Sequence, residues 1–207
     1  GADSGDKNDI ELPRSQKKLL EEVLKVGKPV IFVNVSGSCV NLSRADEACN
    51  AVLQVFYPGA EGGNAVADIL FGKVSPSGKL PVTFYRSTDD LPDFRDYSMA
   101  NRTYKYFKGK PLYPFGYGLS YTRFSITDIN FGSTRTTLRI ANVGDYDGSE
   151  VVKVYARDRN DKELNCRLAG FKKVFLKRGE TAEVQVDICR EVMELFGDMS
   201  GVEFFIG

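Results

Sequence analysis

Apolar and charged residues recur with a helical period near the start of the chain. In residues 14–26 the apolar side chains return every three or four positions, and Pro13 precedes and Gly27 follows the segment. This pattern predicts a helix with one buried stripe, formed by Leu19, Leu20, Val23, Leu24 and Val26. The run VIFVNV at 30–35 is rich in β-branched and aromatic residues and predicts a strand covered on both faces, as in a parallel sheet.

The next segments continue the alternation of helices and strands. A polar loop around Arg44 leads to a second buried strand at 51–57, which stops at Pro58-Gly59. Residues 61–72 predict a helix with Ala65, Val66, Ile69 and Leu70 inward and Gly72 near its end. Residues 75–85 predict a turn and a short strand. Together these elements indicate an α/β sheet layered with helices.

The pattern changes from about residue 123 onward. Period-two stretches are broken by turn signals at 142–144, 147–148 and 158–161, and a further turn signal lies around Gly179. Short strands separated by turns every eight to twelve residues are typical of a β-sandwich. The final GVEFFIG would be its closing strand.

The chain length of 207 residues lies between one large domain and two ordinary ones. We therefore predict two units, an α/β-sandwich domain at 1–118 and an all-β fibronectin type III-like sandwich at 119–207. Because the buried strands begin only after a helix, we expect that one or more N-terminal elements of the α/β unit have been lost.

Composition excludes several kinds of chemistry. Lysine plus arginine equals aspartate plus glutamate at 28 each, and no basic face with interleaved aromatics is seen, so we expect no nucleic-acid partner. The chain has no histidine, which excludes a Ser-His-Asp triad, a Cys-His dyad and an imidazole zinc site. Acid–base chemistry must then rest on carboxylates, lysine, tyrosine or thiols, and we expect no metal ion or cofactor.

Cysteine spacing and the lack of long apolar runs bear on the compartment. Four cysteines without a CxxC pair favour free thiols over disulfides. No run approaches the ~20 apolar residues of a membrane helix, and no signal peptide is visible. These features favour a cytoplasmic location without a membrane partner, although GADSGDKND looks like the middle of a longer protein.

Three long blocks, in collinear order, carry a family resemblance. Residues 57–84 resemble the C-terminal α/β-sandwich domain of glycoside hydrolase family 3, and residues 101–124 resemble the segment that leads out of that domain. Residues 142–158 and 167–188 are similar to the family's fibronectin type III-like domain. The segment DLPDFRDYSMANRTYKYF, at 90–107, is most similar to bacterial members that act on β-xylosides.

The resemblance also interprets LYPFGYGLSYTRF at 112–124, which has five aromatic residues. In the family this stretch closes the α/β domain and leads into the sandwich. Aromatic side chains bury large areas at a junction, and Gly116 and Gly118 permit tight turns. A structural role is preferred, and a sugar-binding platform formed by Tyr113, Phe115, Tyr117 and Tyr121 is the alternative.

Family members of this kind are retaining β-glycosidases, which need two carboxylates roughly 5–5.5 Å apart. The resemblance implies that the nucleophilic aspartate lies in an N-terminal TIM-like barrel, and a barrel of about 250 residues exceeds this chain. The acid/base glutamate of relatives precedes a segment like SGDKNDIELP, where this sequence has Gly1, Ala2 and Asp3. We expect that this glutamate was cut off with the barrel, so that the chain alone is catalytically silent.

Substrate contacts are the remaining candidate roles. Asp6-Lys7 matches a pair that is usually Asp-Arg near the family's active-site loop, and lysine offers charge without the guanidinium fork. Asp96, Tyr97 and Arg102 fall on a segment that could face the barrel's sugar pocket, with surface packing as the alternative. The aspartates at 3, 6 and 9 are interpreted as loop and cap residues.

Two other segments suggest chemistry but have simpler explanations. Glu61 lies at a helix N-terminus, where a carboxylate interacts well with the helix amides. VSGSCV at 35–40 follows a strand but is neither GxSxG nor a P-loop, and no histidine could activate Ser36 or Ser38.

Three hypotheses follow. The chain is the C-terminal part of a β-xylosidase or β-glucosidase, which acts with its barrel on β-linked oligosaccharides. Alternatively it is a free-standing, non-catalytic carbohydrate-binding or assembly module. A third hypothesis, an independent hydrolase using Asp6 or Glu61, lacks a partner carboxylate. An exposed sandwich edge could also pair with a second copy in a homo-oligomer.

Overall fold

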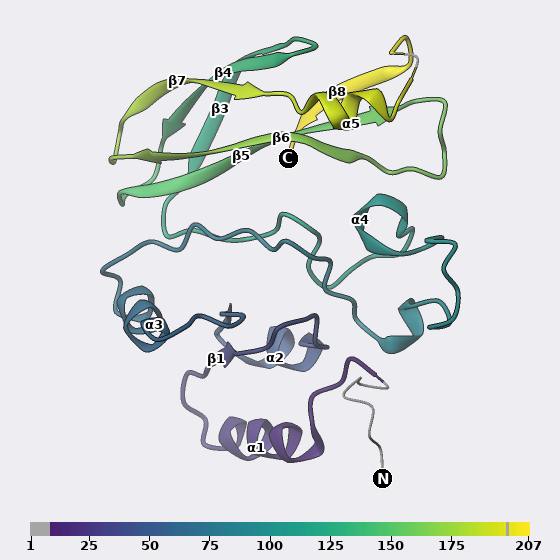
Figure 1. Ribbon diagram of the computed structural model, residues 1–207. Coiled ribbons are helices and arrows are strands. Elements are labelled where there is room, and N and C mark those ends of the chain that lie inside the picture. Colours follow the sequence, from purple (N-terminus) through teal and green to yellow (C-terminus); the bar gives the residue numbers. More distant parts are fainter. Residues whose placement is uncertain (1–8, 198) are drawn as a thin grey trace.

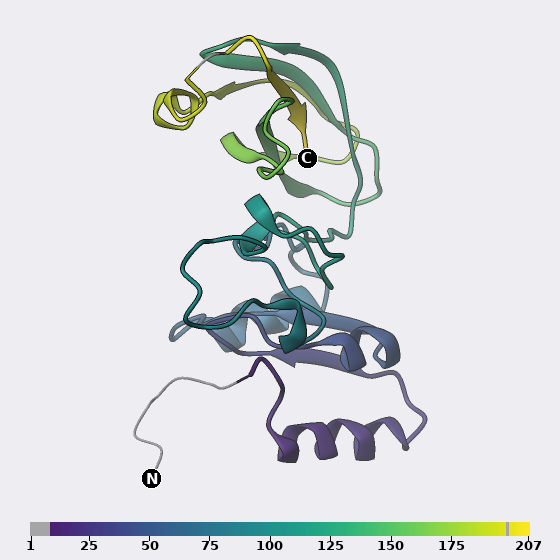
Figure 2. The same cartoon turned by 90° about the vertical axis from the view of Figure 1, so that its right-hand side faces the viewer.

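The computed structural model describes residues 9–197 and 199–207, which form two stacked units (Figure 1). The first unit contains α1 (Arg14–Leu24), β1 (Ile31–Asn34), α2 (Ser43–Ala48), β2 (Ala51–Gln54), α3 (Gly62–Leu70), η1 (Thr88–Asp90) and α4 (Thr103–Tyr106). The second contains β3 (Phe124–Phe131), β4 (Arg135–Asn142), β5 (Gly148–Asp158), β6 (Arg167–Leu176), β7 (Thr181–Asp187), α5 (Arg190–Glu194) and β8 (Val202–Ile206). In Figures 1 and 2, α1 lies at the end of the molecule farthest from the second unit.

The two predicted buried strands pair as a parallel sheet, with Ile31 beside Ala51 and Asn34 beside Gln54. The expectation that β1 is covered on both faces is wrong, because Ile31 is 49% exposed and Val33 is 37% exposed. Within the described residues this sheet has only two strands, and its faces are only partly covered.

The predicted first helix is α1, which follows Pro13 and ends before Gly27, whose φ is +68°. Its predicted buried stripe is wrong in part. Leu20 is buried, whereas Leu19 is 65% exposed and Val26 is 68% exposed. The periodicity identified the helix correctly. Burial of its apolar face depends on the neighbouring elements, and here those elements bury only Leu20.

The core of the first unit comes mainly from its loops. It consists of buried Leu12, Val40, Leu42, Phe84 and Leu112. The strand predicted at 75–85 is reduced to an isolated antiparallel bridge between Phe84 and Tyr113. Pro81 within this segment lacks a backbone N–H, which removes one donor from a sheet ladder.

The second unit is the predicted β-sandwich. Its sheets have the strand orders β3-β4-β7 and β6-β5-β8 (Figure 1). The predicted turns separate these strands, since β4 ends at Asn142 and β5 begins at Gly148. Between the sheets lies a core of Leu138, Ile140, Val152, Val154, Ala156, Ala169, Leu176, Val184, Val186 and Ile188. The fold class is therefore confirmed, while the boundary at 118/119 stays a prediction.

The aromatic stretch at 112–124 forms the junction between the two units. The ring of Phe115 stacks on Tyr104 at 4.1 Å between centroids and meets Tyr155 of β5 edge to face. Tyr117 stacks on Tyr113 at 5.1 Å. Most of these rings are used against protein, as the structural interpretation of this stretch predicts.

Polar contacts join the units on either side of those rings. The buried Lys153 Nζ of β5 donates to the Gly116 carbonyl at 3.0 Å, and Lys79 Nζ lies 3.0 Å from a carboxylate oxygen of Glu150. The side-chain amide of Asn165 donates to the carbonyls of Tyr104 and Phe107, at 3.1 and 2.8 Å. The second unit is therefore positioned on the first by both packing and hydrogen bonds.

Gly118 is a sensitive position in this junction. A Cβ there would lie 2.1 Å from the Gly78 carbonyl oxygen, so the backbone must shift. We expect Gly118→Ala to lower the free energy of unfolding by about 1–3 kcal/mol. Gly63→Ala is the control, since nothing lies within 4 Å of its Cβ and the change removes unfolded-state entropy. Chemical denaturation of both variants checks this, and an equal response would contradict it.

Candidate functional site

The segment after η1 carries the predicted substrate-binding residues that the structure describes. It begins with a capping box, in which Ser87 Oγ accepts from Asp89 N at 3.1 Å and Asp90 Oδ2 accepts from Ser87 N at 3.1 Å. The loop then returns to Thr103, whose N–H donates to the Tyr85 hydroxyl at 2.9 Å. Both ends of the loop are thus attached to the first unit.

The structure brings Asp96, Tyr97 and Arg102 together in this loop. Arg102 Nη2 donates to the carbonyls of Asp93 and Asp96, at 2.7 and 3.0 Å. The half-buried guanidinium group therefore holds the loop's shape. These contacts show that Arg102 positions the backbone near Tyr97.

Asp96 contributes a charge to the loop, and Tyr97 contributes an exposed aromatic ring. A hydrogen bond from Ser98 N to Asp96 Oδ1, at 2.9 Å, lowers the pKa of Asp96 below its usual value. Like an ordinary aspartate, it is ionised at neutral pH, and the hydrogen bond favours that charged form further. Tyr97 is 84% exposed and Phe94 is 79% exposed, so the loop presents two aromatic side chains to solvent.

The start of the described chain is attached beside the same loop. Ile10 N donates to Thr88 Oγ1 of η1 at 3.2 Å, and Asn41 N donates to the Ile10 carbonyl at 2.7 Å. Asp9 Oδ1 accepts from Glu11 N at 2.9 Å, which is the turn role expected for this aspartate. The predicted pair Asp6 and Lys7, together with Asp3, lies outside the described residues.

Glu61 occupies the N-cap of α3, as the sequence predicts. Its exposed carboxylate accepts from the Asn64 side-chain amide at 2.6 Å and makes no capping hydrogen bond, so the expected contact with the helix amides is not formed. This arrangement stabilises the helix start and involves no second carboxylate. Glu61 is a structural residue in this geometry.

A polar network that the sequence analysis missed lies where the two parallel strands end. Asn34 Nδ2 donates to Gln54 Oε1 at 2.5 Å and to Ser36 Oγ at 2.9 Å, and Ser36 Oγ donates to the Ser38 carbonyl at 2.9 Å. The sequence signal for this network was the single polar residue in each apolar strand, Asn34 in VIFVNV and Gln54 in AVLQVFY. Ser36 is used within this network, in agreement with setting VSGSCV aside as a nucleophile.

The described residues hold neither a metal-binding cluster nor a membrane-spanning helix. Across residues 9–197 and 199–207, no three cysteine or acidic side chains gather in a way that could hold a metal ion. Within the same residues, no helix combines the length and apolar character needed to cross a membrane. All four cysteines are free thiols, which confirms that expectation.

Comparison with known protein families identifies both units. Residues 1–121 match the glycosyl hydrolase family 3 C-terminal domain. The chain belongs to glycosyl hydrolase family 3. Residues 150–201 of this family 3 chain match the fibronectin type III-like domain. The resemblance read from the sequence is confirmed.

Two curated relatives illustrate how this family 3 chain relates to longer proteins. It is 41% identical over 203 residues to a xylan 1,4-β-xylosidase of Xylanibacter ruminicola, covering 95% of this chain and 24% of that protein. It is 33% identical to a periplasmic β-glucosidase of Salmonella typhimurium, covering 94% and 28%. The chain thus spans about a quarter of the length of these relatives.

Solved structures agree with this family 3 assignment. A β-glucosidase from Erythrobacter marinus matches with a TM-score of 0.80 and 35% identity, over 100% of this chain and 30% of that one. β-Glucosidase 3B from Thermotoga neapolitana, in complex with glucose, matches with a TM-score of 0.79 and 33% identity, over 89% and 30%. These likenesses extend through both units.

Proposed function

We propose that this chain is the C-terminal part of a retaining β-glycosidase that removes terminal β-linked sugars, in particular xylosyl residues, from oligosaccharides. The observation that carries the proposal is the 41% identity to a xylan 1,4-β-xylosidase through both units. The proposal includes an N-terminal TIM-like barrel as the partner that holds the nucleophilic aspartate, with the acid/base glutamate also outside this chain.

The described acidic residues support a division of labour between this chain and the barrel. Hydrolysis with retention needs two carboxylates roughly 5–5.5 Å apart. Asp9 accepts from the Glu11 N–H in a turn and Glu61 accepts from the Asn64 side-chain amide, and neither contact involves a second carboxylate. This chain then contributes a surface beside the barrel's active site that contacts the substrate, here called the substrate wall.

The loop after η1 is the part of the chain that suits this wall. Arg102 holds its backbone, Asp96 keeps a negative charge beside it, and Tyr97 offers an exposed ring with a hydroxyl. Aromatic faces pack on the C–H faces of sugar rings, and ionised carboxylates accept hydrogen bonds from sugar hydroxyls. We assign Tyr97 and Asp96 to substrate contact and Arg102 to positioning, and Asp6 and Lys7 remain candidates beside them.

A hybrid enzyme tests this function. In it, this chain replaces the matching 203 residues of the Xylanibacter ruminicola enzyme. We expect the hybrid to hydrolyse an aryl β-xyloside and the isolated chain to be inactive. Turnover by the isolated chain that Asp6→Asn abolishes would contradict the proposal, and so would a folded hybrid without activity. Sub-millimolar binding of xylo-oligosaccharides by the isolated chain would favour a free-standing binding module.

Tyr97→Ala in the hybrid tests the loop. Loss of one aromatic contact to the sugar is expected to lower kcat/KM about tenfold. Tyr57→Ala is the matched control, because Tyr57 is 80% exposed but lies in another part of the unit. Equal kcat/KM values for the two variants would remove Tyr97 from the substrate wall.

A further inference from the structure

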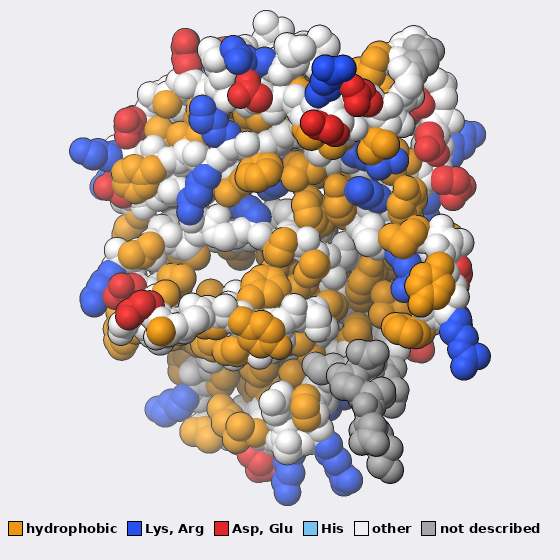
Figure 3. All heavy atoms as spheres, in the orientation of Figure 1, with side chains coloured by type: hydrophobic (Ala, Val, Ile, Leu, Met, Phe, Trp, Pro, Cys, Tyr) orange, Lys and Arg blue, Asp and Glu red, His pale blue; other side chains and the backbone are white. Residues whose placement is uncertain are grey.

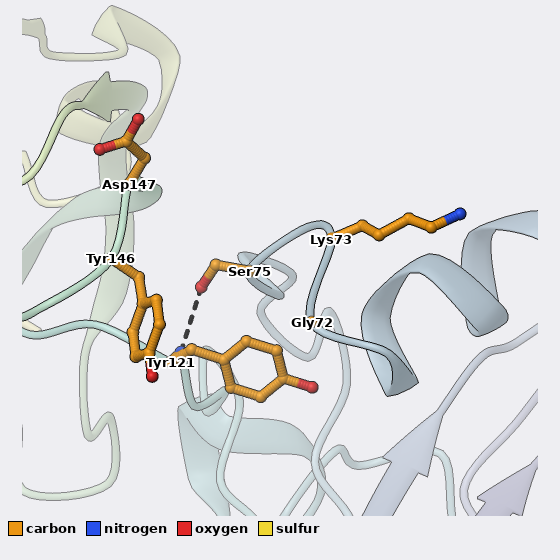
Figure 4. A pocket seen from close by; sticks show the side chains of 6 residues that line it. All are labelled: Gly72, Lys73, Ser75, Tyr121, Tyr146 and Asp147. Atoms are coloured by element: carbon orange, nitrogen blue, oxygen red, sulfur yellow. Dashed lines mark hydrogen bonds between the residues drawn. The ribbon is translucent and has the colours of Figure 1, made fainter.

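A hollow of about 450 Å³ opens at the junction of the two units. It is lined by Gly72, Lys73, Ser75, Tyr121, Tyr146 and Asp147. Figure 3 shows this face of the molecule, where hydrophobic and charged side chains are interspersed over both units. In Figure 4, Tyr121 and Tyr146 approach the hollow from separate segments, with Ser75 beside them. The volume is within the range of about 300–1,000 Å³ that small-molecule sites occupy.

Tyr121 is held by hydrogen bonds at its backbone and at its phenol hydroxyl. Its backbone N–H donates to Ser75 Oγ at 3.1 Å, and its phenol hydroxyl donates to the Ile69 carbonyl at 2.8 Å. Ser75 Oγ is itself 2.9 Å from Ser120 Oγ. The hydroxyl is hydrogen-bonded and Tyr121 is 44% exposed, so the ring is a preorganised flat surface on which a ligand could pack.

Tyr146 is anchored through its backbone. Its carbonyl accepts from the side-chain amide of Asn142 at 2.8 Å, and Asn142 is 1% exposed. The Tyr146 side chain is 60% exposed. A rigid loop therefore presents an exposed aromatic ring opposite the first unit.

The two charged side chains that line the hollow already have polar partners, an ion pair for Lys73 and a backbone N–H for Asp147. Lys73 Nζ lies 3.1 Å from Asp68 Oδ1, and Asp147 Oδ1 accepts from Arg178 N at 2.8 Å. Figure 4 shows both lining side chains, Lys73 and Asp147, extending away from the tyrosine rings. A neutral ligand suits these surroundings better than a phosphate or another anion.

We propose that this hollow binds a neutral oligosaccharide, with one sugar ring packed on Tyr121 or Tyr146. Two exposed aromatic rings, neighbouring polar groups and balanced charge match the mixed apolar and hydroxyl surface of a pyranose. The carbohydrate class rests on the proposed function, and xylo-oligosaccharides are the expected ligands. Gly72, Lys73 and Ser75 of the α/β unit line the hollow opposite Tyr146 of the sandwich, so the bound sugar would also bridge the two units.

Titration of the ¹⁵N-labelled chain with xylotriose, followed by NMR, tests the site. A shallow site with two ring contacts is expected to bind with a Kd of about 1 mM, with shifts at the amides of Ser75, Tyr121 and Tyr146. Tyr146→Ala is expected to weaken binding about tenfold. Phe175→Ala is the matched control, since Phe175 is also 60% exposed but lies on β6, and it is expected to leave the Kd unchanged.

Three results would overturn the site: no shifts with xylotriose or cellotriose, shifts that Tyr146→Ala leaves intact, or shifts caused by a proline-rich peptide in place of the sugars. The hybrid enzyme separates this inference from the proposed function. With Tyr146→Ala the hybrid is expected to keep its turnover of a short aryl β-xyloside. An inactive hybrid with normal xylotriose binding would count against the enzyme assignment and not against the hollow.

Discussion

Replacing Phe84 by alanine is expected to lower the free energy of unfolding of the α/β unit by about 3–5 kcal/mol. Phe84 is 0% exposed and packs in the core with Val40, Leu42 and Leu112. Its N–H donates to the Tyr113 carbonyl at 2.9 Å, and its own carbonyl accepts from Leu112 N at 2.8 Å. Truncation leaves a cavity in this closely packed core, beside the backbone hydrogen bonds that join Phe84 to Leu112 and Tyr113, so few side chains can move to fill it.

Hydrogen exchange localises this effect, because the two units need not unfold together. In Phe84→Ala the amides of Leu42 and Leu112 are expected to lose protection, while that of Val154 in the sandwich keeps most of it. Phe94→Ala is the control, since Phe94 is 79% exposed and its change should stay within about 0.5 kcal/mol. A Phe84→Ala loss as small as that of Phe94→Ala would show that the core does not depend on this ring.

Asn142→Ala is expected to have the second large effect, a loss of about 3 kcal/mol or more from the sandwich. The buried amide joins four segments. Its Oδ1 accepts from Thr122 Oγ1 at 2.6 Å and Gly144 N at 3.2 Å, and its Nδ2 donates to the carbonyls of Tyr146 and Leu176 at 2.8 and 3.1 Å. In the alanine variant those donors and acceptors lose the Asn142 amide while they remain buried. The desolvation cost of buried groups without a partner exceeds the net stabilisation that the hydrogen bonds provide.

Two further variants sharpen this test, which is measured by chemical denaturation. Asn142→Asp keeps the side-chain shape but removes both donors and buries a carboxyl group, so we expect it to be destabilised as well. Val143→Ala changes the neighbouring residue, which is 55% exposed, and should be nearly neutral. If Asn142→Ala were as stable as Val143→Ala, the network would not hold the loop that carries Tyr146.

The sandwich was the most predictable part of the fold. Its strands alternate apolar and polar residues, and its turns carry Asn, Asp and Gly, so both signals act within a few residues of one another. Asn142 illustrates the limit of this reasoning. The sequence marks it as a turn residue, whereas the structure shows that its side chain links β4, β6 and the junction.

The α/β unit was less predictable, and each miss has a local cause. Residues 43–48 form α2 where a loop was expected, because a helix of six residues is too short to show an apolar period. The 75–85 segment has strand-like residues, yet it forms no strand, and the β-bridge between Phe84 and Tyr113 is isolated. Of the stripe predicted on α1 only Leu20 is buried, because what covers a helix cannot be determined from the helix itself.

The candidate site shows the same division. Asp96, Tyr97 and Arg102 were selected from one short segment, and they do lie on one loop. That Arg102 is used to bind the carbonyls of Asp93 and Asp96 could not be seen, since a side chain's partners are set by how the loop folds back. The hollow was also hidden, because Ser75 and Tyr121 are 46 positions apart and the α/β residues that line it meet Tyr146 only when the two units pack.

The amino-acid sequence by itself determined the family, the two kinds of unit and the absence of imidazole chemistry, because these depend on residue types and on periodicity along the chain. Tertiary structure alone decided which aromatic rings are packed against protein and which face solvent. It also decided which carboxylates serve as caps. The physical reason is that burial and hydrogen-bond partnership are properties of residues brought together from distant positions, and local patterns carry no record of those neighbours.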